Sequence, residues 1–322
     1  MSGARTTGDV LVLRALGLGD ALTGVAALRG VRRAWPERRV VLAGPAATGT
    51  WLRDLGVVDD LLVTQGLAPL TWDGTGHVAV NLHGRGPQSH RVLAATRPAR
   101  LVAYATPEHP QGPTWRADEH EVVRWCRLVT SAGGPCDASD LRLPVPPDRA
   151  TAPGTVVLHP GAASGSRRWP VARWGEVARA LVDAGQDVTL TGGPAEADLC
   201  AAVAEASGRD LRVLAGSLDV PGLAGLVAGA RLVVCGDTGV AHLATAVATP
   251  SVLLFGPTPP RWWGPAIDSG RHAVLWHGDP HRPGDPHGTD VDPALTAITV
   301  DQVLEAVVAL LAAPASHGHA WG

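Results

Sequence analysis

Short apolar runs alternate with glycine-rich turns and amphipathic segments along this chain, and the whole series occurs twice. The first series starts with the run at residues 10–13, the turn at 17–20 and a segment at 22–28 with apolar residues at helical spacing. The second starts at residues 155–158, after a turn-rich stretch at 131–154 that contains five prolines. Predominantly apolar runs are typical of parallel strands that helices cover on both faces. The pattern therefore predicts two doubly wound α/β domains.

The same pattern gives the expected elements and domain limits. Strands are expected at residues 10–13, 39–43, 78–82, 101–104, 155–158, 187–191, 211–214, 231–235 and 251–255. Helices are expected after the turn at 17–20 and at residues 115–130, 174–184, 195–206, 221–230, 239–247 and 301–312. The proline-rich stretch marks the domain boundary. We expect an N-terminal domain at 1–150, a second domain at 151–300, and a C-terminal helix and tail at 301–322.

Charge and composition exclude several function classes. The chain has 322 residues, 45% of them hydrophobic, which is enough for two cores. Its net charge of −3 gives no overall electrostatic argument for a nucleic-acid partner. All 27 basic residues are arginine, so a Walker A phosphate loop and a Schiff-base lysine are excluded. Any phosphate that a side-chain cation holds must be held by arginine.

The cysteines and the N-terminus suggest a reducing compartment. The four cysteines contain no Cys-x-x-Cys pair, so we expect neither a zinc knuckle nor a disulfide framework. Cys200 and Cys235 lie in apolar runs and are expected to be buried thiols. Residues 1–9 lack an apolar signal segment, and no run reaches the roughly 18 apolar residues that span a bilayer. We therefore expect a soluble protein.

Asp20 is the first residue that could carry chemistry. It stands where a glycine turn meets a predicted helix, so it is either an N-cap or a carboxylate that acts as a general base. The turn is not a dinucleotide fingerprint, because Gly17, Gly19 and Gly24 do not fit G-x-G-x-x-G. A carboxylate beside the helix start would also repel a pyrophosphate, which disfavours nicotinamide binding.

The loop after the expected strand at 155–158 suggests an anion site. Its small residues, from His159 to Gly165, let backbone N–H groups approach an anion, and Arg167 and Arg168 can bind phosphate oxygens bidentately. We expect a helix N-terminus at Ala162 to contribute. A solvated basic loop is the alternative.

Two further turns in the second half carry polar groups. Glu196 lies in the first turn of a predicted helix, where it either compensates the helix dipole or accepts hydrogen bonds from a ribose. The helix that opens at Gly239 offers N–H groups and the Thr238 hydroxyl to a second anion site. Asp237 and His242 are placed to converge on one ligand there, although a histidine at such a point is often structural.

Other polar residues give weaker indications. His277, His281 and His287 match no common metal-site spacing, and no metal site is expected. His83, Arg85 and Gln88, in and after the loop at 81–86, are candidate ligand contacts in the first domain. Solvated loop residues are an equally good interpretation of these three.

Five motifs in a fixed order resemble one known family. They are Leu18-Gly19-Asp20, then His159-Pro160-Gly161-Ala162 with Arg167-Arg168-Trp169-Pro170, then Gly192-Gly193-Pro194-Ala195-Glu196, then Asp237-Thr238-Gly239-Val240-Ala241-His242-Leu243-Ala244, then Phe255-Gly256-Pro257-Thr258. The set resembles glycosyltransferase family 9, the ADP-heptose:lipopolysaccharide heptosyltransferase family. The resemblance runs from about residue 10 to about residue 265, and the Asp-x-Gly-x-x-His-Leu-Ala string is its most specific part.

The resemblance implies a fold and a set of roles. It implies a GT-B-like fold of two Rossmann-type domains facing a central cleft, with the acceptor in the first and a nucleotide-sugar donor in the second. Asp20 falls on the family's catalytic base, and Arg167 falls where the family usually has lysine against the donor pyrophosphate. With the anion-loop residues, the candidate donor-binding set is His159, Gly161, Ala162, Arg167, Arg168, Glu196, Asp237, Thr238, Gly239 and His242.

The implied activity is inverting, metal-independent glycosyl transfer without a cofactor. The donor would be a nucleotide sugar such as ADP-heptose, and the acceptor a glycan or lipid-linked hydroxyl, as in lipopolysaccharide core biosynthesis. The implied location is the cytoplasm, with peripheral contact at the inner membrane face as an option and no nucleic-acid partner. Two alternatives stay open: a non-catalytic nucleotide-sugar-binding protein of the same fold, and a nucleotide-sugar epimerase.

Overall fold

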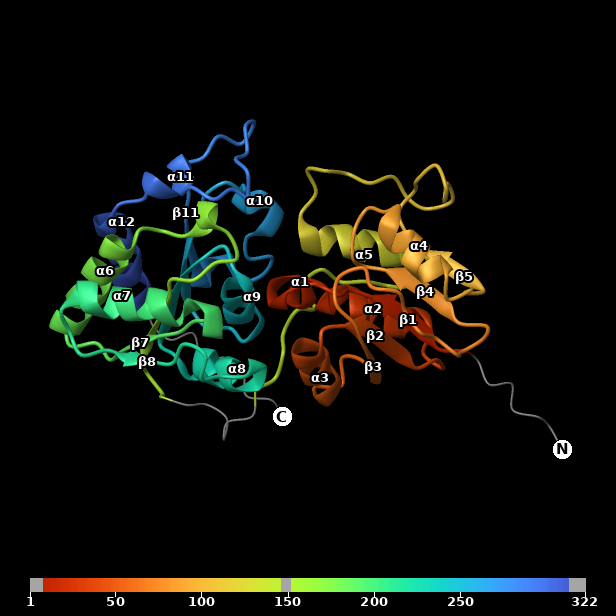
Figure 1. The fold of residues 1–322 in the computed structure, drawn as a ribbon, viewed down its shortest axis with the longest axis horizontal. Helices are drawn as coiled ribbons and strands as arrows, with labels where there is room; N and C mark the ends of the chain where they lie inside the picture. The colour runs from red at the N-terminus through yellow and green to blue at the C-terminus, as the bar shows by residue number, and fades with distance from the viewer. Residues whose placement is uncertain (1–7, 146–151, 313–322) are drawn as a thin grey trace. The chain divides into compact units, whose positions relative to one another are not determined.

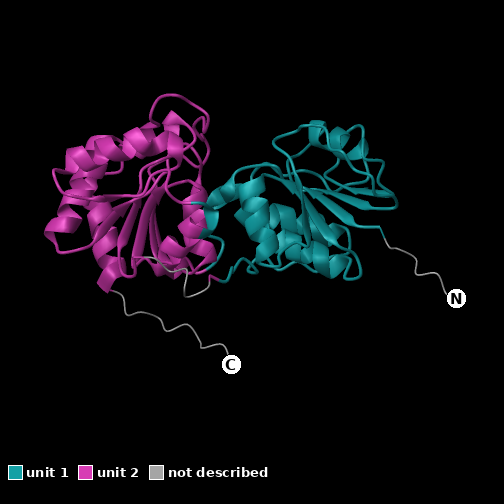
Figure 2. Ribbon diagram, turned by 60° about the horizontal axis from the view of Figure 1, so that its bottom comes forward, with its two compact units in different colours: residues 1–144, 219–221, 261–267 teal, residues 145–218, 222–260, 268–322 magenta. Residues whose placement is uncertain are grey.

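The computed structural model describes residues 8–145 and 152–312, which form two compact units (Figures 1 and 2). Unit 1 holds the chain up to Pro144 together with Asp219–Pro221 and Arg261–Ile267, and unit 2 holds the rest. The chain passes from unit 1 to unit 2 inside the proline-rich stretch at 131–154. Residues 146–151 of that stretch and the expected tail at 313–322 lie outside the described residues.

Unit 1 is built on a five-stranded parallel sheet with the strand order β3-β2-β1-β4-β5. Leu11 at its centre is paired with Val41 on one side and Ala79 on the other. The strands are β1 (Val10–Leu13), β2 (Val40–Gly44), β3 (Asp60–Val63), β4 (Val78–Asn81) and β5 (Arg100–Val102). The helices that flank them are α1 (Leu18–Thr23), α2 (Val25–Ala34), α3 (Ala46–Asp54), α4 (Gln88–Ala94) and α5 (Glu121–Ser131).

The second half contains a six-stranded parallel sheet with the order β11-β10-β9-β6-β7-β8. Its strands are β6 (Val156–His159), β7 (Val188–Leu190), β8 (Arg212–Val213), β9 (Leu232–Gly236), β10 (Ser251–Leu254) and β11 (His272–Leu275). The α-helices are α6 (Val171–Asp183), α7 (Ala197–Ser207), α8 (Val220–Gly229), α9 (Gly239–Ala246), α10 (Pro260–Trp263), α11 (Pro293–Thr296) and α12 (Val300–Ala312). Short 3₁₀ turns are η2 (Gly165–Arg167), η3 (Pro194–Glu196) and η4 (Ser269–Arg271).

Burial explains why the sequence pattern was so regular. Every residue of β1 and every residue of β6 is buried, because helices cover both faces of each sheet. In unit 2 the core includes Trp169 and Trp174, whose rings meet edge to face at 5.3 Å. Two doubly wound α/β sheets are therefore confirmed. Within the described residues, no helix combines the length and the apolar character that a bilayer crossing requires.

Several elements differ from expectation, each for a local reason. The elements α3, β3, α4, α10, β11 and α11 were not predicted. Of these, β3 and β11 are short strands at the sheet edges, and most of their residues are only partly buried. The predicted helix at 115–130 begins only at Glu121. His120 caps it, because its Nδ1 accepts from the Val122 N–H at 3.2 Å. Trp115 instead lies before the helix, with its ring 5.0 Å from that of Tyr104.

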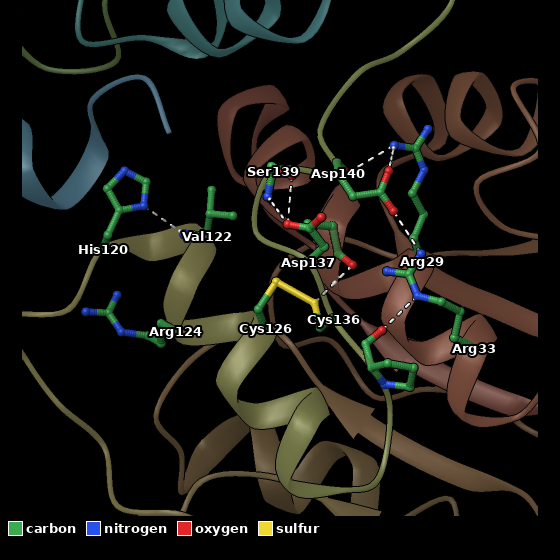
Figure 3. The surroundings of a disulfide bond; sticks show 12 residues. Arg29, Arg33, His120, Val122, Arg124, Cys126, Cys136, Asp137, Ser139 and Asp140 are labelled. Carbon is green, nitrogen blue, oxygen red and sulfur yellow. Dashed lines mark hydrogen bonds and ion pairs between the residues drawn. A yellow bond between two sulfur atoms is a disulfide. The ribbon is translucent and has the colours of Figure 1, made fainter. Parts of the chain in front are cut away.

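The expectation of no disulfide is wrong for one pair of cysteines. Cys126 of α5 and Cys136, in the segment that follows this helix, form a disulfide with their Cα atoms 5.2 Å apart (Figure 3). The chain reverses after α5, and Gly30 of α2 leaves room for Cys136, since an ideal Cβ there would lie 3.0 Å from the Cys136 Cβ. Sequence spacing alone does not reveal such a return of the chain. Cys200 and Cys235 are free and buried, as expected, and burial raises the pKa of Cys200 to about 11.

Candidate functional site

Each sheet has a topological switch point, which is the place where the strand order reverses direction. In the five-stranded sheet it lies between β1 and β4, and in the six-stranded sheet between β6 and β9. The loops after two such strands turn to opposite faces of the sheet and leave a crevice beyond the carboxyl ends, where α/β proteins bind ligands. The main candidate residues follow these four strands.

Asp20 lies in the first turn of α1, two residues after the helix begins at Leu18. Gly17 is the N-cap residue and is extended, so the interpretation of Asp20 as an N-cap is wrong. A glycine can occupy this cap position at little cost, which leaves the Asp20 carboxylate available for another role. The side chain is 30% exposed.

The electrostatic surroundings of Asp20 raise its proton affinity. Burial raises the pKa of Asp20 above its ordinary value, and the negative charge of Glu121 adds to this effect. The positive charge of Arg14 and backbone hydrogen bonds at Gly17 and Asp20 act in the opposite direction without cancelling it. A carboxylate with a raised pKa is a stronger general base than an exposed one.

Arg14 and Glu121 were not singled out in the sequence. Arg14 directly follows the apolar run of β1 and is 1% exposed, and Glu121 opens α5 and is 5% exposed. The one available signal for Arg14 was a charge between an apolar run and a glycine turn. Glu121 gave no such signal, because an acidic residue in the first turn of a helix is ordinary.

His83 follows β4 and lies at the same switch point. Its Nδ1 accepts a hydrogen bond from the Ala15 N–H at 3.2 Å, and its backbone N–H donates to the Asn81 side chain at 3.1 Å. Burial lowers the pKa of His83, and the charge of Arg14 lowers it further. The structure thus brings His83 beside Arg14. Arg85, in the following loop, and Gln88, the first residue of α4, are exposed.

In unit 2, three candidate residues gather at the ends of β6 and β7. His159 ends β6, and its Nδ1 lies 3.0 Å from the Thr191 hydroxyl. Glu196 ends η3, and its carboxylate accepts from the Gly193 N–H at 2.7 Å. An ideal Cβ at Gly161 would overlap this carboxylate, so the close approach requires a glycine. Burial lowers the pKa of His159, while the charge of Glu196 acts in the opposite direction.

The loop after β6 differs from expectation at Ala162. No helix begins there; the backbone continues to η2 at Gly165, and α6 begins at Val171. Ser164 is extended and caps η2, so the N–H groups of a long helix do not converge at Ala162. The expected helix N-terminus is therefore wrong. The Ala162 carbonyl instead accepts from Arg168 Nε at 2.9 Å.

Arg167 connects the two loops of the unit 2 switch point. Its Nη1 donates to the carbonyl of Asp237 at 3.1 Å, and its Nε donates to Ser164 Oγ at 3.2 Å. Asp237 is buried directly after β9. Thr238 occupies the N-cap position of α9 without a side-chain capping bond; the helix starts at Gly239, and His242 lies in its first turn. The arrangement places a cation and helix N–H groups together, which suits an anionic ligand.

The long loop after β11 contains hydrogen bonds at His277 and His281. His277 Nε2 lies 3.1 Å from Gln302 Oε1, and the backbone N–H of His281 donates to Asp279. Across residues 8–145 and 152–312, no three histidine, cysteine, aspartate or glutamate side chains are placed to hold a metal ion.

Comparisons with known proteins point to one family. The sequence profile of glycosyltransferase family 9 (heptosyltransferase) matches residues 116–282. Lipopolysaccharide heptosyltransferase 1 of Pseudomonas aeruginosa is 39% identical over 113 residues, which cover 35% of this chain and 31% of that protein. The match covers 31% of that protein and 46% of lipooligosaccharide heptosyltransferase 2 of Haemophilus influenzae, so the chain spans about a third to a half of the length of these curated relatives.

Solved structures agree on the fold. A glycosyltransferase family 9 protein of Veillonella parvula has a TM-score of 0.78 at 17% identity, covering 97% of this chain and 99% of that one. An Escherichia coli heptosyltransferase solved with ADP has a TM-score of 0.68 at 18% identity, covering 94% and 99%. The profile covers more than half of the sequence and includes the motifs at both loops of the unit 2 switch point. This chain belongs to glycosyltransferase family 9.

Proposed function

We propose that this protein is an inverting glycosyltransferase that moves a sugar, heptose in the first instance, from a nucleotide-diphosphate donor to an acceptor hydroxyl. The observation that carries the proposal is the pair of switch points: a partly buried carboxylate at the one in unit 1, and an arginine with helix N–H groups at the one in unit 2. Family membership and the relatives named as heptosyltransferases support it.

The proposed reaction is a single displacement. Asp20 accepts the proton of the acceptor hydroxyl as the acceptor oxygen forms a bond to the anomeric carbon of the donor. The bond between that carbon and the diphosphate oxygen breaks, and the nucleoside diphosphate leaves with the electron pair. Attack opposite the leaving group inverts the anomeric configuration. The raised pKa of Asp20 assists the proton transfer.

Residues of unit 2 bind the donor in this proposal. Arg167 and the N-terminus of α9 stabilise the negative charge that develops on the departing diphosphate. Glu196, beside Gly161, accepts hydrogen bonds from the ribose. Because an arginine and backbone N–H groups can neutralise this charge, the proposed mechanism uses no metal ion and no cofactor. The heptosyltransferase solved with ADP makes ADP the first donor nucleotide to try.

The acceptor is proposed to be a glycan or lipid-linked sugar of the lipopolysaccharide core type, since the matched relatives are named lipopolysaccharide and lipooligosaccharide heptosyltransferases. His83, beside Arg14, is the acceptor-side residue that lies at the switch point. Arg85 and Gln88 are proposed as outer acceptor contacts, because both are exposed on the adjoining segment. The reaction is assigned to the cytoplasm, at the inner membrane face when the acceptor is lipid-linked.

The test is a transfer assay with labelled ADP-heptose, a panel of glycan and lipid-linked acceptors, and NMR assignment of the product anomer. We expect acceptor-dependent release of ADP, an inverted product, and equal rates with and without a chelator. Asp20→Asn should lower kcat by about 10²–10⁴-fold while ADP affinity by calorimetry stays unchanged. ADP binding without transfer to any acceptor would favour the binding protein, and a free epimer formed without acceptor would favour the epimerase.

A further inference from the structure

Arg14 ties together the segments that meet behind Asp20. Its guanidinium donates to the carbonyls of Asp20 and Leu82 and, at 2.9 Å, to Thr23 Oγ1. An ideal Cβ at Gly24 would lie 2.8 Å from Arg14 Cδ and Nε, so the junction of α1 and α2 needs a glycine to admit this side chain. The turn that carries Asp20 is thereby fixed to the carboxyl end of β4.

Glu121 is the buried counter-ion of Arg14. Its Oε1 lies 3.3 Å from Arg14 Nη2 and accepts from Trp125 Nε1 at 2.6 Å. Its Oε2 accepts from Arg124, whose guanidinium also donates to three backbone carbonyls before α5. Both oxygens of Glu121 therefore have hydrogen-bond partners, so the burial of this carboxylate leaves neither oxygen unpaired.

The Asp20 carboxylate stands at the margin of this network. Arg14 Nη2 lies 3.9 Å from Asp20 Oδ1, beyond hydrogen-bond distance, because its N–H groups are directed at Thr23 and Glu121. A carboxylate that accepts directly from a guanidinium has a much lower proton affinity than one beside it. Arg14 therefore places a positive charge near the Asp20 carboxylate without the direct hydrogen bond that would lower its proton affinity strongly.

We propose that Arg14 and Glu121 are positioning residues: Arg14 anchors the turn that carries Asp20, and Glu121 holds the guanidinium out of direct contact with the Asp20 carboxylate. The inference rests on the proposed function, in which Asp20 is the base. In unit 1, charged and titratable groups face this region from three elements: Arg14 after β1, His83 after β4, and His120, Glu121 and Arg124 at the start of α5.

The test measures kcat/KM against pH in two single variants and compares the acid limbs of the two profiles. Glu121→Gln removes a negative charge, keeps an acceptor for Trp125 and frees Arg14 to bond to Asp20. Its acid limb should therefore move to lower pH, and its plateau should fall roughly 10-fold because the base is weaker. Arg14→Met removes the positive charge, so its limb should move to higher pH. A structural role alone would not shift the two limbs in opposite directions.

Controls separate the possible failures. Glu119→Gln removes a carboxylate that is 9% exposed and paired with Arg127, and its limb should match wild type. If Arg14→Met does not fold, the double variant Arg14→Met with Glu121→Gln replaces it, because it removes both charges of the pair. The acid limb of the double variant should lie between the limbs expected for the two single variants. Limbs that coincide with wild type would overturn the positioning role. Full transfer by Asp20→Asn would instead overturn the proposed function.

Discussion

At the scale of single residues, the structure shows which charged side chains surround each motif residue. Asp20 is kept partly buried beside one positive and one negative side chain, with its pKa raised chiefly by burial. The forked guanidinium of Arg167 donates to the Ser164 hydroxyl and to the Asp237 carbonyl, and so links two loops. A lysine has a single point charge and would not make both contacts in the same way.

We predict that Asp20→Asn stabilises the protein at pH 7 although it slows transfer. Because the folded pKa of Asp20 is raised, the folded state binds the proton more tightly than the unfolded state does. Stability is therefore lost as pH rises through the unfolded pKa towards the folded one, and the charged carboxylate destabilises the fold at pH 7. The melting temperature of the variant should exceed that of wild type at pH 7, and the difference should shrink in acid.

The matched control is Asp183→Asn, on the surface of unit 2. Hydrogen bonds from Arg209 lower the pKa of Asp183, so removing this charge should not stabilise the protein at pH 7. An Asp20→Asn variant that melts below wild type at pH 7 would show that the carboxylate is a net stabilising group.

At the scale of elements, two loops of unit 2 are packed backbone to backbone. The Ser166 N–H donates to the Gly288 carbonyl at 3.0 Å, and the Asp292 N–H donates to the Ser166 carbonyl at 3.2 Å. An ideal Cβ at Gly165 would overlap the backbone carbonyl of Thr289. The position of Arg167 in η2 therefore depends on a loop that is far away in the sequence.

We predict that Gly165→Ala destabilises the protein by about 1–3 kcal/mol, because the added methyl group must push two backbones apart. Urea unfolding measures the loss, and ADP calorimetry should show weaker binding as Arg167 shifts. Gly270→Ala is the control: an ideal Cβ there meets no atom within 4 Å, so its effect should stay within about 1 kcal/mol. Equal stability of the two variants would contradict the close packing at Gly165.

The disulfide between Cys126 and Cys136 closes a short loop after α5, with a sequence separation of 10. By loop-closure entropy, we expect it to add about 2–3 kcal/mol to the free energy of unfolding. Reductant should lower the urea midpoint of the wild-type protein by a corresponding amount. The double variant Cys126→Ser with Cys136→Ser should be insensitive to reductant. A wild-type midpoint that does not respond to reductant would argue against the bond.

At the scale of the whole molecule, each unit has its own parallel sheet and its own hydrophobic core. The proposed roles follow this division, with the base in unit 1 and the donor-binding groups in unit 2. Ligand binding should consequently stabilise one unit more directly than the other.

We predict that ADP slows backbone hydrogen exchange mainly in unit 2. Protection should be strongest at residues 159–168, 192–196 and 236–242, which form the proposed donor site. At a free ADP concentration 100 times Kd, amides that exchange by unfolding of unit 2 should gain up to about 2.7 kcal/mol of protection. Hydrogen-exchange mass spectrometry with and without ADP makes the measurement, and GMP at the same concentration tests nucleotide selectivity. Stronger protection in β1 and β4 than in unit 2 would contradict the assignment.

Much of the fold was predictable because buried parallel strands leave a clear signal. The expected strands at the sheet centres, such as 10–13 and 155–158, match β1 and β6 to within a residue. The edge strands β3 and β11 were missed, whereas the edge strands β5 and β8 were predicted at 101–104 and 211–214. The disulfide was missed because its formation depends on how the chain returns after α5.

The sequence by itself determined the two α/β units, the family and the motifs after the strands, because strand burial and glycine turns act over a few neighbouring residues. Only the tertiary structure decided which side chains meet at each switch point. Arg14 and Glu121 are 107 residues apart, and Arg167 and Asp237 are 70 apart. Tertiary packing, rather than local sequence, brings such residues together. In unit 1 the burial of Asp20 and the nearby charges of Arg14 and Glu121 set the proton affinity of Asp20.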